Sequence, residues 1–543
     1  MKFHSKIAAQ YKKRLGASLE NSDAHQCEHK NWSRRDFMRL TGLAGMGAGM
    51  SIAGTPLSAF TPSPMLAALA SGDCGDRVLV MIRLKGGNDG MNMVILRGND
   101  EYYNIRPTIA IQENELWGLS QEIGMPNTML DLQPFWNDGK MQVIHNVGYP
   151  NQNYSHFRSS DIWASASGSR DVVNTGWIGR FLDNEYQAFL SAPPVVPPAL
   201  EIGISSNMIF RSGSSNMALA ISNPREFYQI AQTGQLFDTS SLSSSPRDLE
   251  LAFTRQVANS AYRYSESIRD AYNSSSTQAS YQDNYLSEQL AIVARLIKGN
   301  LGTKVYMVSI GGFDTHADQS QYHPNLMNAL ATGIRAFYDD LAASGVSQNV
   351  LSFTFSEFGR TIFENGSNGT DHGTGAPMLV FGEGIGPKFH GTPPDLLDLN
   401  RYGDPEYSVD FRNVYASVMQ DWLCQDPSVS GFVLGNEIDK ITGLLPESNP
   451  PLGANGDEAL LGHAQSLEKP GVIEIKYALS RRGTVRLQIL DKSGYPLRTL
   501  LYGFKDKGSH IFEFKPSEWF LPSGRYNYKL DTGGKVYARP IQW

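Results

Sequence analysis

Short apolar runs alternate with longer segments of helical period between residues 76 and 445. The runs have the length and the flanking turn residues of strands. They span residues 78–84, 141–147, 199–204, 304–310, 351–355 and 377–381. A helical period predicts helices over 249–297, with an interruption at 273–277, and over 325–343 and 409–423. Strands alternating with helices predict an α/β fold with a mostly parallel sheet that helices cover on both faces.

The pattern changes after residue 445. Residues 446–467 are rich in proline, glycine and asparagine and predict a linker. From residue 472 apolar residues recur at every second position, as at Ile473, Ile475 and Tyr477, with glycine turns between the runs. Residues 468–543 are therefore predicted to form a small C-terminal all-β sandwich. This module has no cluster of ligand-type residues, so we expect a role in attachment or secretion.

The N-terminal segment resembles an export signal. Arg34 and Arg35 precede an uncharged stretch over 40–59, and Ala68-Leu69-Ala70 offers a small-x-small cleavage pattern. A transmembrane anchor is the alternative, but the stretch is rich in glycine and prolines follow it closely. We predict a twin-arginine signal over 1–70, with the twin-arginine export machinery as a partner. The mature protein, beginning near residue 71, is then periplasmic, on the cell surface or extracellular, without a permanent membrane span.

Composition excludes few classes of protein. The formal charge is −7 and the hydrophobic share is 41%, as in an ordinary globular chain. No basic patch of the kind that binds nucleic acid is present, so no nucleic-acid partner is expected. Of three cysteines, Cys27 belongs to the predicted signal, while Cys74 and Cys424 remain. An oxidising compartment permits these two to pair, but their spacing does not require it.

Carboxylates and imidazoles follow several predicted strands, where an open α/β sheet builds its site. Asp314 and His316 alternate along an extended segment, so both side chains point the same way. Oxygen ligands mixed with histidine suit a divalent ion, with zinc, manganese or calcium as candidates. The candidate ligands are Asp89, Asp314, His316, Glu357, Asp371 and His372. Two have alternatives: Asp89 as a turn residue bonded to its own backbone, and Glu357 as an ion-pair partner of Arg360.

The run Ser155-His156-Phe157-Arg158 follows the predicted strand over 141–147. Ser155 is either a plain helix N-cap or, together with His156 and Arg158, part of a metal-activated nucleophile with an anion clamp. Arg158 or Arg360 would neutralise charge on the transferring group. The candidate catalytic residues are therefore Ser155, His156, Arg158 and Arg360.

Six motifs taken in order carry a resemblance to a known family. They are Ser33-Arg-Arg-Asp-Phe, Leu84-Lys-Gly-Gly-Asn-Asp-Gly, Ser155-His-Phe-Arg-Ser, Gly312-Phe-Asp-Thr-His, Ser356-Glu-Phe-Gly-Arg-Thr and Asp371-His-Gly. From residue 31 to 445 the chain resembles the exported "domain of unknown function 1501" (DUF1501) family, which is related to the alkaline phosphatase and sulfatase superfamily. The resemblance implies a doubly wound fold of the alkaline-phosphatase type with metal at the strand ends. The C-terminal module resembles Ig-like or sorting modules of secreted bacterial proteins.

The resemblance also implies roles for single residues. Asp89, Asp314, His316 and His372 fall at ligand positions of the superfamily, and Ser155 falls in the region of its nucleophile. Phe358 stands where that pattern has a histidine. No Cys-x-Pro-x-Arg motif is present, so formylglycine sulfatase chemistry is unsupported.

Two functions are expected from these observations. The first is an exported, metal-dependent hydrolase-like protein that acts on a phosphate or sulfate ester of a small molecule or a glycan. The alternative is a non-catalytic pseudo-enzyme or binding protein on the same fold, displayed outside the cytoplasm. The phenylalanine at 358 favours the alternative, because a fold does not by itself confer activity.

Overall fold

The computed structural model describes residues 76–446 and 459–543, except 187–188, 190–192, 205, 214, 232–236, 238–245, 426, 437, 466–470, 480–481, 492–495 and 533–535. The predicted signal over 1–70 lies outside the described residues. The chain divides into two compact units, Met1–Ser58 with Asp238–Arg255, and Ala59–Phe237 with Gln256–Trp543. Of the first unit the structure describes only the beginning of helix α9 (Pro246–Ser274). All that follows concerns the second unit.

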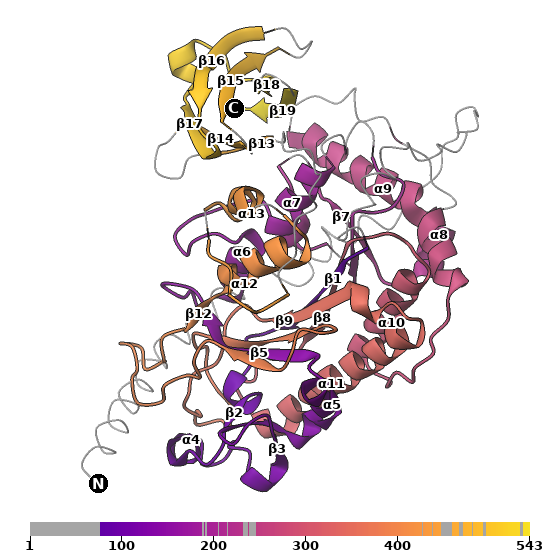
Figure 1. Ribbon diagram of the computed structural model, residues 1–543, viewed down its shortest axis with the longest axis vertical. Helices are drawn as coiled ribbons and strands as arrows, with labels where there is room; N and C mark the ends of the chain where they lie inside the picture. The colour runs from indigo at the N-terminus through magenta and orange to yellow at the C-terminus, as the bar shows by residue number, and fades with distance from the viewer. Residues whose placement is uncertain are drawn as a thin grey trace. The chain divides into compact units, whose positions relative to one another are not determined.

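A nine-stranded sheet forms the centre of the α/β region (Figure 1). Its strands are β1 (Val78–Lys85), β5 (Met141–Gly148), β6 (Ala199–Ile202), β7 (Ala218–Ile221), β8 (Val305–Gly311), β9 (Val350–Phe355), β10 (Ala376–Phe381), β11 (Lys388–His390) and β12 (Val409–Asp410). The order is β11-β5-β10-β9-β1-β8-β6-β7, with β12 also paired to β5. Among these pairings only those of β10 are antiparallel.

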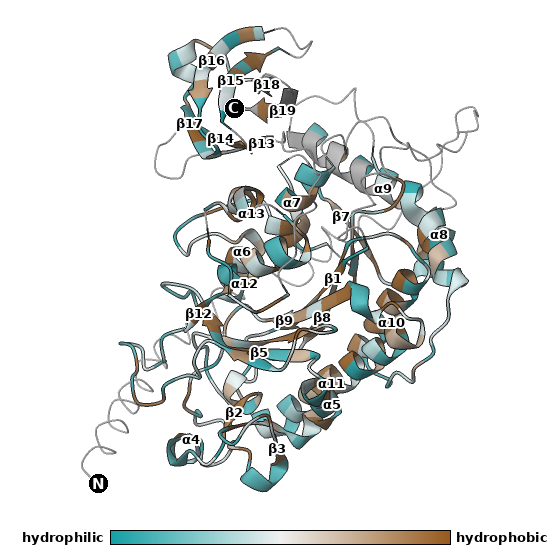
Figure 2. Ribbon diagram, in the orientation of Figure 1, coloured by the Kyte–Doolittle hydropathy of each residue, from teal (hydrophilic) through white to brown (hydrophobic). Residues whose placement is uncertain are grey.

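Helices cover both faces of this sheet, as the alternating side chains of β1 illustrate. Val80 and Ile82 pack in one apolar core with helices α10 (Tyr285–Lys298) and α11 (Gln319–Ala343). Leu79 and Met81 point to the other face and pack with α6 (His156–Ser165), α7 (Trp177–Glu185) and α12 (Phe411–Ser417). The strands are apolar because both of their faces are buried (Figure 2). The predicted doubly wound, mostly parallel α/β fold is confirmed.

Several elements differ from the predictions. The interruption predicted in the long helical segment is confirmed, but it is longer than predicted, because α9 ends at Ser274 and α10 begins at Tyr285. Helix α11 begins at Gln319, six residues before the predicted start, and contains Pro324 in its first turns. Pro324 is the sixth residue of this helix, beyond the first turn, so it removes one intrahelical hydrogen bond. The remaining helices and strands of this region are α4 (Asp100–Ile105), α5 (Gln133–Asn137), α8 (Pro224–Ala231), α13 (Pro427–Leu434) and the small sheet of β2 (Ile95–Leu96), β3 (Leu116–Gly118) and β4 (Ile123–Pro126).

The C-terminal region consists of two antiparallel sheets, as the alternating pattern predicts. One contains β13 (Ala459–Gln465), β14 (Ile473–Leu479) and β17 (Gly508–Phe514), and the other β15 (Gly483–Leu490), β16 (Pro496–Lys505), β18 (Arg525–Asp531) and β19 (Val536–Gln542). Inward side chains such as Ile475, Leu487 and Tyr528 share one core. Strand β13 lies within the segment predicted as a linker, so the antiparallel region begins at least by residue 459.

Two further observations concern the export predictions. Among the described residues no helix is both long and apolar enough to span a membrane. Cys424 forms a disulfide, and the two other cysteines of the chain, Cys27 and Cys74, lie outside the described residues.

The direction of the strands decides where polar loops meet. Strands β1, β5, β8 and β9 run the same way, so the segments that follow them leave the sheet at one edge. Strand β10 runs the opposite way, so the segment that precedes it lies at that same edge. Residues far apart in sequence are therefore gathered at the carboxyl edge of the parallel strands.

Candidate metal centre

Three segments deliver side chains to one place at this edge. His156 opens helix α6 after β5, Asp314 and His316 follow β8, and His372 precedes β10. The loop after β1 comes so close that a Cβ on Gly86 would lie 2.4 Å from the backbone nitrogen of Asp314. Glycine at this position therefore permits the loops to pack against each other.

Three imidazole nitrogens converge on one carboxylate oxygen. Oδ1 of Asp314 lies 3.1 Å from Nε2 of His316, 3.3 Å from Nε2 of His372 and 3.5 Å from Nε2 of His156. The Nε2 atoms of His316 and His372 are 3.0 Å apart. Ligands about 2.1 Å from one tetrahedral ion would lie roughly 3.4 Å from one another, so these separations suit a shared ion.

Each imidazole is held through its other nitrogen. Nδ1 of His156 lies 3.0 Å from Oε1 of Glu357, and Nδ1 of His316 lies 3.1 Å from Oδ1 of Asp371. Nδ1 of His372 donates to the backbone oxygen of Tyr154 at 2.7 Å. Because these partners are acceptors, each imidazole in its neutral form carries its proton on Nδ1 and turns its Nε2 lone pair toward Asp314, as in metal-bound histidines.

The three imidazole nitrogens and the carboxylate of Asp314 are groups that bind a cation. Two Nε2 lone pairs 3.0 Å apart repel each other unless a proton or a metal ion lies between them. Nε2 of His156 is buried and has no hydrogen-bond partner among the described residues. His156, Asp314 and His372 form a group that can hold a metal ion, with ligand atoms within 4.8 Å of one another. Several nitrogens with one oxygen suit zinc or a related ion better than calcium, which prefers oxygen ligands.

The electrostatics of the group favour positive charge. Burial alone would raise the pKa of Asp314, but the three histidines and Arg360 around its carboxylate hold it far below its ordinary value. Burial likewise opposes the charged form of His156, yet the neighbouring carboxylates of Asp314 and Glu357 raise its pKa to about 9. For His372 burial prevails and lowers the pKa. Asp314 is 45% exposed at its side chain, so solvent reaches this charge directly.

Arg360 positions Asp314 and is enclosed by backbone. Its guanidinium donates to the carbonyls of Gly87, Thr370 and Phe313 at 2.8, 2.9 and 3.1 Å, to the carbonyl of Gly86, and to Asp314. The side chain is fully buried. The predicted role, neutralising charge on a transferring group, does not fit a guanidinium whose donors already bind these acceptors.

Asp89 is not brought into the group of histidines. Its carboxylate makes a two-pronged pair with Arg106 at 2.6 and 3.0 Å and accepts a hydrogen bond from Gln319. Burial would raise its pKa, but the charge and hydrogen bonds of Arg106 outweigh burial and lower it. Arg106 also donates to Asn92 and to the carbonyl of Ile362. In this arrangement Asp89 neutralises a buried arginine, which differs from the metal-ligand role predicted for it.

Glu357 and Asp371 each contact the Nδ1 atom of a histidine, on the side of the ring away from Asp314. Oε1 of Glu357 accepts from the backbone nitrogen of Gly86 as well as bonding His156. Oδ1 of Asp371 bonds both His316 and the amide of Asn365. Both were predicted as ligands, but their bonded oxygens orient the imidazoles. Carboxylate partners of this kind raise the basicity of a ligating histidine.

The other predicted catalytic residues make local contacts. Ser155 is the N-cap of α6, but its side chain makes no capping hydrogen bond. Arg158 donates to the carbonyls of Ser169 and Asp171, so it holds a loop. The ring of Phe358, where the superfamily pattern has a histidine, lies 4.8 Å from His156 and 4.6 Å from His372 between ring centroids. Phe358 therefore forms an apolar wall of the group.

Two contributors were not identified as such from the sequence. His156 was predicted as a catalytic residue, yet its Nε2 lies with the ligand nitrogens. Its place after β5, at the same edge as the other loops, is the signal that could have identified it. The backbone oxygen of Tyr154, which holds His372, carries no sequence signal because any residue supplies a carbonyl.

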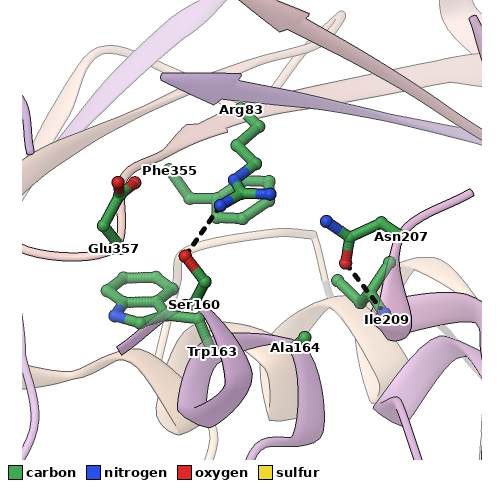
Figure 3. A pocket seen from close by; sticks show the side chains of 8 residues that line it. All are labelled: Arg83, Ser160, Trp163, Ala164, Asn207, Ile209, Phe355 and Glu357. Atoms are coloured by element: carbon green, nitrogen blue, oxygen red, sulfur yellow. Dashed lines mark hydrogen bonds between the residues drawn. The ribbon is translucent and has the colours of Figure 1, made fainter. Parts of the chain in front are cut away.

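A small pocket lies behind Glu357. Its lining residues are Arg83, Ser160, Trp163, Ala164, Asn207, Ile209, Phe355 and Glu357 (Figure 3). Arg83 crosses it to donate to Oγ of Ser160 at 2.7 Å. Burial would raise the pKa of Glu357, but the hydrogen bond from His156 and the charge of Arg83 together lower it. The ionised carboxylate is thus stabilised both by Arg83 and by His156.

Comparisons with known proteins agree with the family resemblance. Residues 140–396 match the family described as "Protein of unknown function (DUF1501)". The fold is similar to a sulfatase from Pseudoalteromonas sp., with 10% identity, a TM-score of 0.32 and coverage of 84% of this chain and 89% of that chain. It is also similar to a protein in the alkaline phosphatase superfamily from Vibrio parahaemolyticus, with 10% identity, a TM-score of 0.27 and coverage of 84% and 91%. No curated protein matches the chain. At these scores the likeness assigns no role to single residues.

Proposed function

We propose that this chain, which belongs to the DUF1501 family over residues 140–396, is an exported, metal-dependent hydrolase that acts on a phosphate or sulfate ester. The observation that supports the proposal is the convergence of three Nε2 atoms on Oδ1 of Asp314. Each imidazole is oriented by a hydrogen bond at its Nδ1 atom. His156, His316, His372 and Asp314 would hold the ion. The described ligand set provides for one ion, because the carboxylate of Asp89 is taken by Arg106.

A divalent ion bound by these residues supplies a Lewis acid for an ester oxygen and lowers the pKa of a bound water. The chain's own residues have supporting roles. Glu357 and Asp371 keep the imidazoles in the ligating tautomer, and Arg360 fixes the carboxylate of Asp314. Ser155, directly before His156, has no capping bond and is the candidate nucleophile, with water as the alternative.

Export is part of the proposal and rests on the arginine pair at residues 34 and 35 and the cleavage pattern near residue 70. The disulfide at Cys424 supports it, because such bonds persist mainly in oxidising compartments.

One observation favours a second function, a metal-binding protein without hydrolytic activity. Arg158 and Arg360, the predicted anion clamps, both donate to backbone carbonyls. A hydrolase of anionic esters needs cationic groups that stabilise charge in the transition state. The second function thus predicts bound metal and no turnover.

The test is the metal content and activity of the purified full chain. Elemental analysis should find about one zinc or manganese per chain, and p-nitrophenyl phosphate or p-nitrophenyl sulfate should be hydrolysed. His316→Ala and His372→Ala should lose both metal and activity, whereas His510→Ala, in the C-terminal strand β17, should keep both. Metal without hydrolysis of either ester would favour the second function. A metal-free protein that stays metal-free on addition of zinc and manganese would overturn both.

A further inference from the structure

A tight turn over residues 399–405 stands beside the candidate metal centre. Leu399 and Pro405 pair as an isolated bridge, and the backbone nitrogen of Asn400 donates to the carbonyl of Asp404 at 2.8 Å. The side-chain oxygen of Asn400 accepts from the backbone nitrogens of Tyr402 and Asp404. Gly403 has φ +82°, a conformation that favours glycine. The turn is thus held in one shape by its own hydrogen bonds.

The turn is fastened to the segments that hold His372. Oγ1 of Thr374, two residues after His372, donates to the carbonyl of Pro405 at 2.7 Å. The hydroxyl of Tyr154 donates to Oδ2 of the buried Asp404 at 3.1 Å. Tyr154 is also the residue whose carbonyl accepts from Nδ1 of His372. The turn and the histidine therefore share two anchors.

Two exposed residues at the tip have the chemistry of a binding surface. Tyr402 is 45% exposed, and its ring centroid lies 6.2 Å from that of Tyr154. The guanidinium carbon of Arg401 lies 4.6 Å from the Tyr402 ring centroid, and Nη2 of Arg401 donates to the hydroxyl of Tyr402. The turn thus presents a planar cation and an aromatic ring to solvent, and it is bonded to Tyr154, the residue that also holds His372. Burial in a core explains neither side chain.

We propose that Arg401 and Tyr402 form the substrate-binding rim of this site and bind a sugar that carries an anionic ester. The proposal rests on the proposed function and names its substrate class, an acidic glycan. Guanidinium groups bind sulfate and phosphate oxygens in pairs, and an aromatic ring offers a flat apolar surface to the C–H face of a sugar. Because Arg158 and Arg360 are bound to carbonyls, Arg401 supplies the cation that anion recognition requires.

The chain contains a matched control pair. In the C-terminal sheets, the guanidinium carbon of Arg486 lies 5.0 Å from the ring centroid of Tyr502, and Tyr502 is 64% exposed. Both pairs join an exposed arginine to an exposed tyrosine. Arg401→Ala with Tyr402→Ala is therefore compared with Arg486→Ala with Tyr502→Ala in the full chain.

The measurement is binding of dextran sulfate, phosphomannan and neutral dextran, with metal content and thermal unfolding measured on the same samples. The unsubstituted protein should bind dextran sulfate or phosphomannan at least tenfold more tightly than dextran, and the better of the two identifies the ester. The substitutions at 401 and 402 should weaken this binding about tenfold or more. Those at 486 and 502 should change it less than twofold. All variants should keep the metal content and melting temperature of the parent.

Two results would overturn the proposal: no preference for either acidic glycan, or an equal loss of binding in both double variants. Failure of the proposed function is separately visible, because it is read from metal content and ester hydrolysis. Tyr154 holds His372 through a backbone carbonyl, so removing the side chains at 401 and 402 leaves that hydrogen bond in place.

Discussion

Oε1 of Glu357 lies 3.0 Å from Nδ1 of His156, so this carboxylate faces the nitrogen that points away from the ligand group. The arrangement orients the imidazole and makes Nε2 the more basic nitrogen. It also gives the buried charge of Glu357 two hydrogen-bond donors, since the backbone nitrogen of Gly86 donates to the same oxygen at 2.9 Å. Glu357 thereby couples the β1 loop to the histidine.

Replacing Glu357 with glutamine should reduce zinc affinity by roughly 10- to 100-fold, the usual cost of losing such a partner. The amide keeps the shape and an oxygen acceptor, but it lacks the charge that raises the basicity of Nε2. The measurement is a zinc titration in competition with a chromogenic chelator. Glu201→Gln, at another buried glutamate, is the control and should leave zinc affinity unchanged. Equal affinity in Glu357→Gln and the parent would contradict the assigned role.

Asp89→Asn should destabilise the fold and leave the metal content unchanged. The substitution leaves Arg106 buried without its counter-charge, which costs roughly 3–5 kcal/mol in the free energy of unfolding. Urea unfolding and elemental analysis measure the two effects. Asp339→Asn, which breaks the exposed pair with Arg335, should cost less than about 1 kcal/mol. Loss of metal without loss of stability would instead make Asp89 a ligand.

Much of this architecture follows from the sequence pattern. The strands that precede Asp314, His316 and Glu357 were predicted because they are short apolar runs, and the loops after parallel strands share one edge. It was therefore predictable that the segment with Asp314 and His316 would lie near the segment with Glu357, whereas the position of His372 depends on the direction of β10. The direction of β10 was not predictable, because an apolar run has the same composition whichever way it pairs.

The roles of single residues could not be predicted, because they depend on contact partners that the pattern of apolar and polar residues does not reveal. Arg106 lies 17 residues from Asp89 and is fully buried, but in the sequence it is one arginine among many. Likewise nothing in the run Ser356–Arg360 indicates that Arg360 turns back to the carbonyls of Gly86 and Gly87. Side-chain rotation decides which carboxylate ligates and which one orients, and rotation is fixed only by the assembled loops.

Arg360→Lys should cost roughly 3 kcal/mol in the free energy of unfolding, although the charge is kept. A lysine has three donors on one nitrogen and cannot reach acceptors spread around a planar guanidinium, so buried carbonyls lose their partners. Arg335→Lys, at an exposed pair on α11, is the matched control and should change stability by less than about 0.5 kcal/mol. Urea unfolding of both variants checks this. A similar cost in both would mean that the carbonyl contacts contribute little.

The stability of the α/β region should fall on acidification in a way that depends on His323. This residue lies in α11, is buried, and bonds through Nε2 to Oδ1 of Asn88. Burial lowers its pKa to about 4, an effect that the charge of Asp89 only partly opposes. The ordinary pKa of histidine is about 6.5, so between these values the unfolded chain binds a proton that the folded chain does not.

The sign of the effect follows from this difference. The stability that neutral His323 contributes is fully present above about pH 6.5 and is lost as the pH falls toward 4. At pH 5 the loss amounts to about 2 kcal/mol of unfolding free energy. His323→Gln keeps a donor for Asn88 but does not titrate. The fall in unfolding free energy from pH 7.5 to pH 5 should therefore be about 2 kcal/mol smaller in the variant than in the parent. The other histidines are common to both proteins, so their contributions cancel in this comparison. Equal pH dependence in the two proteins would show that folding does not lower the pKa of His323.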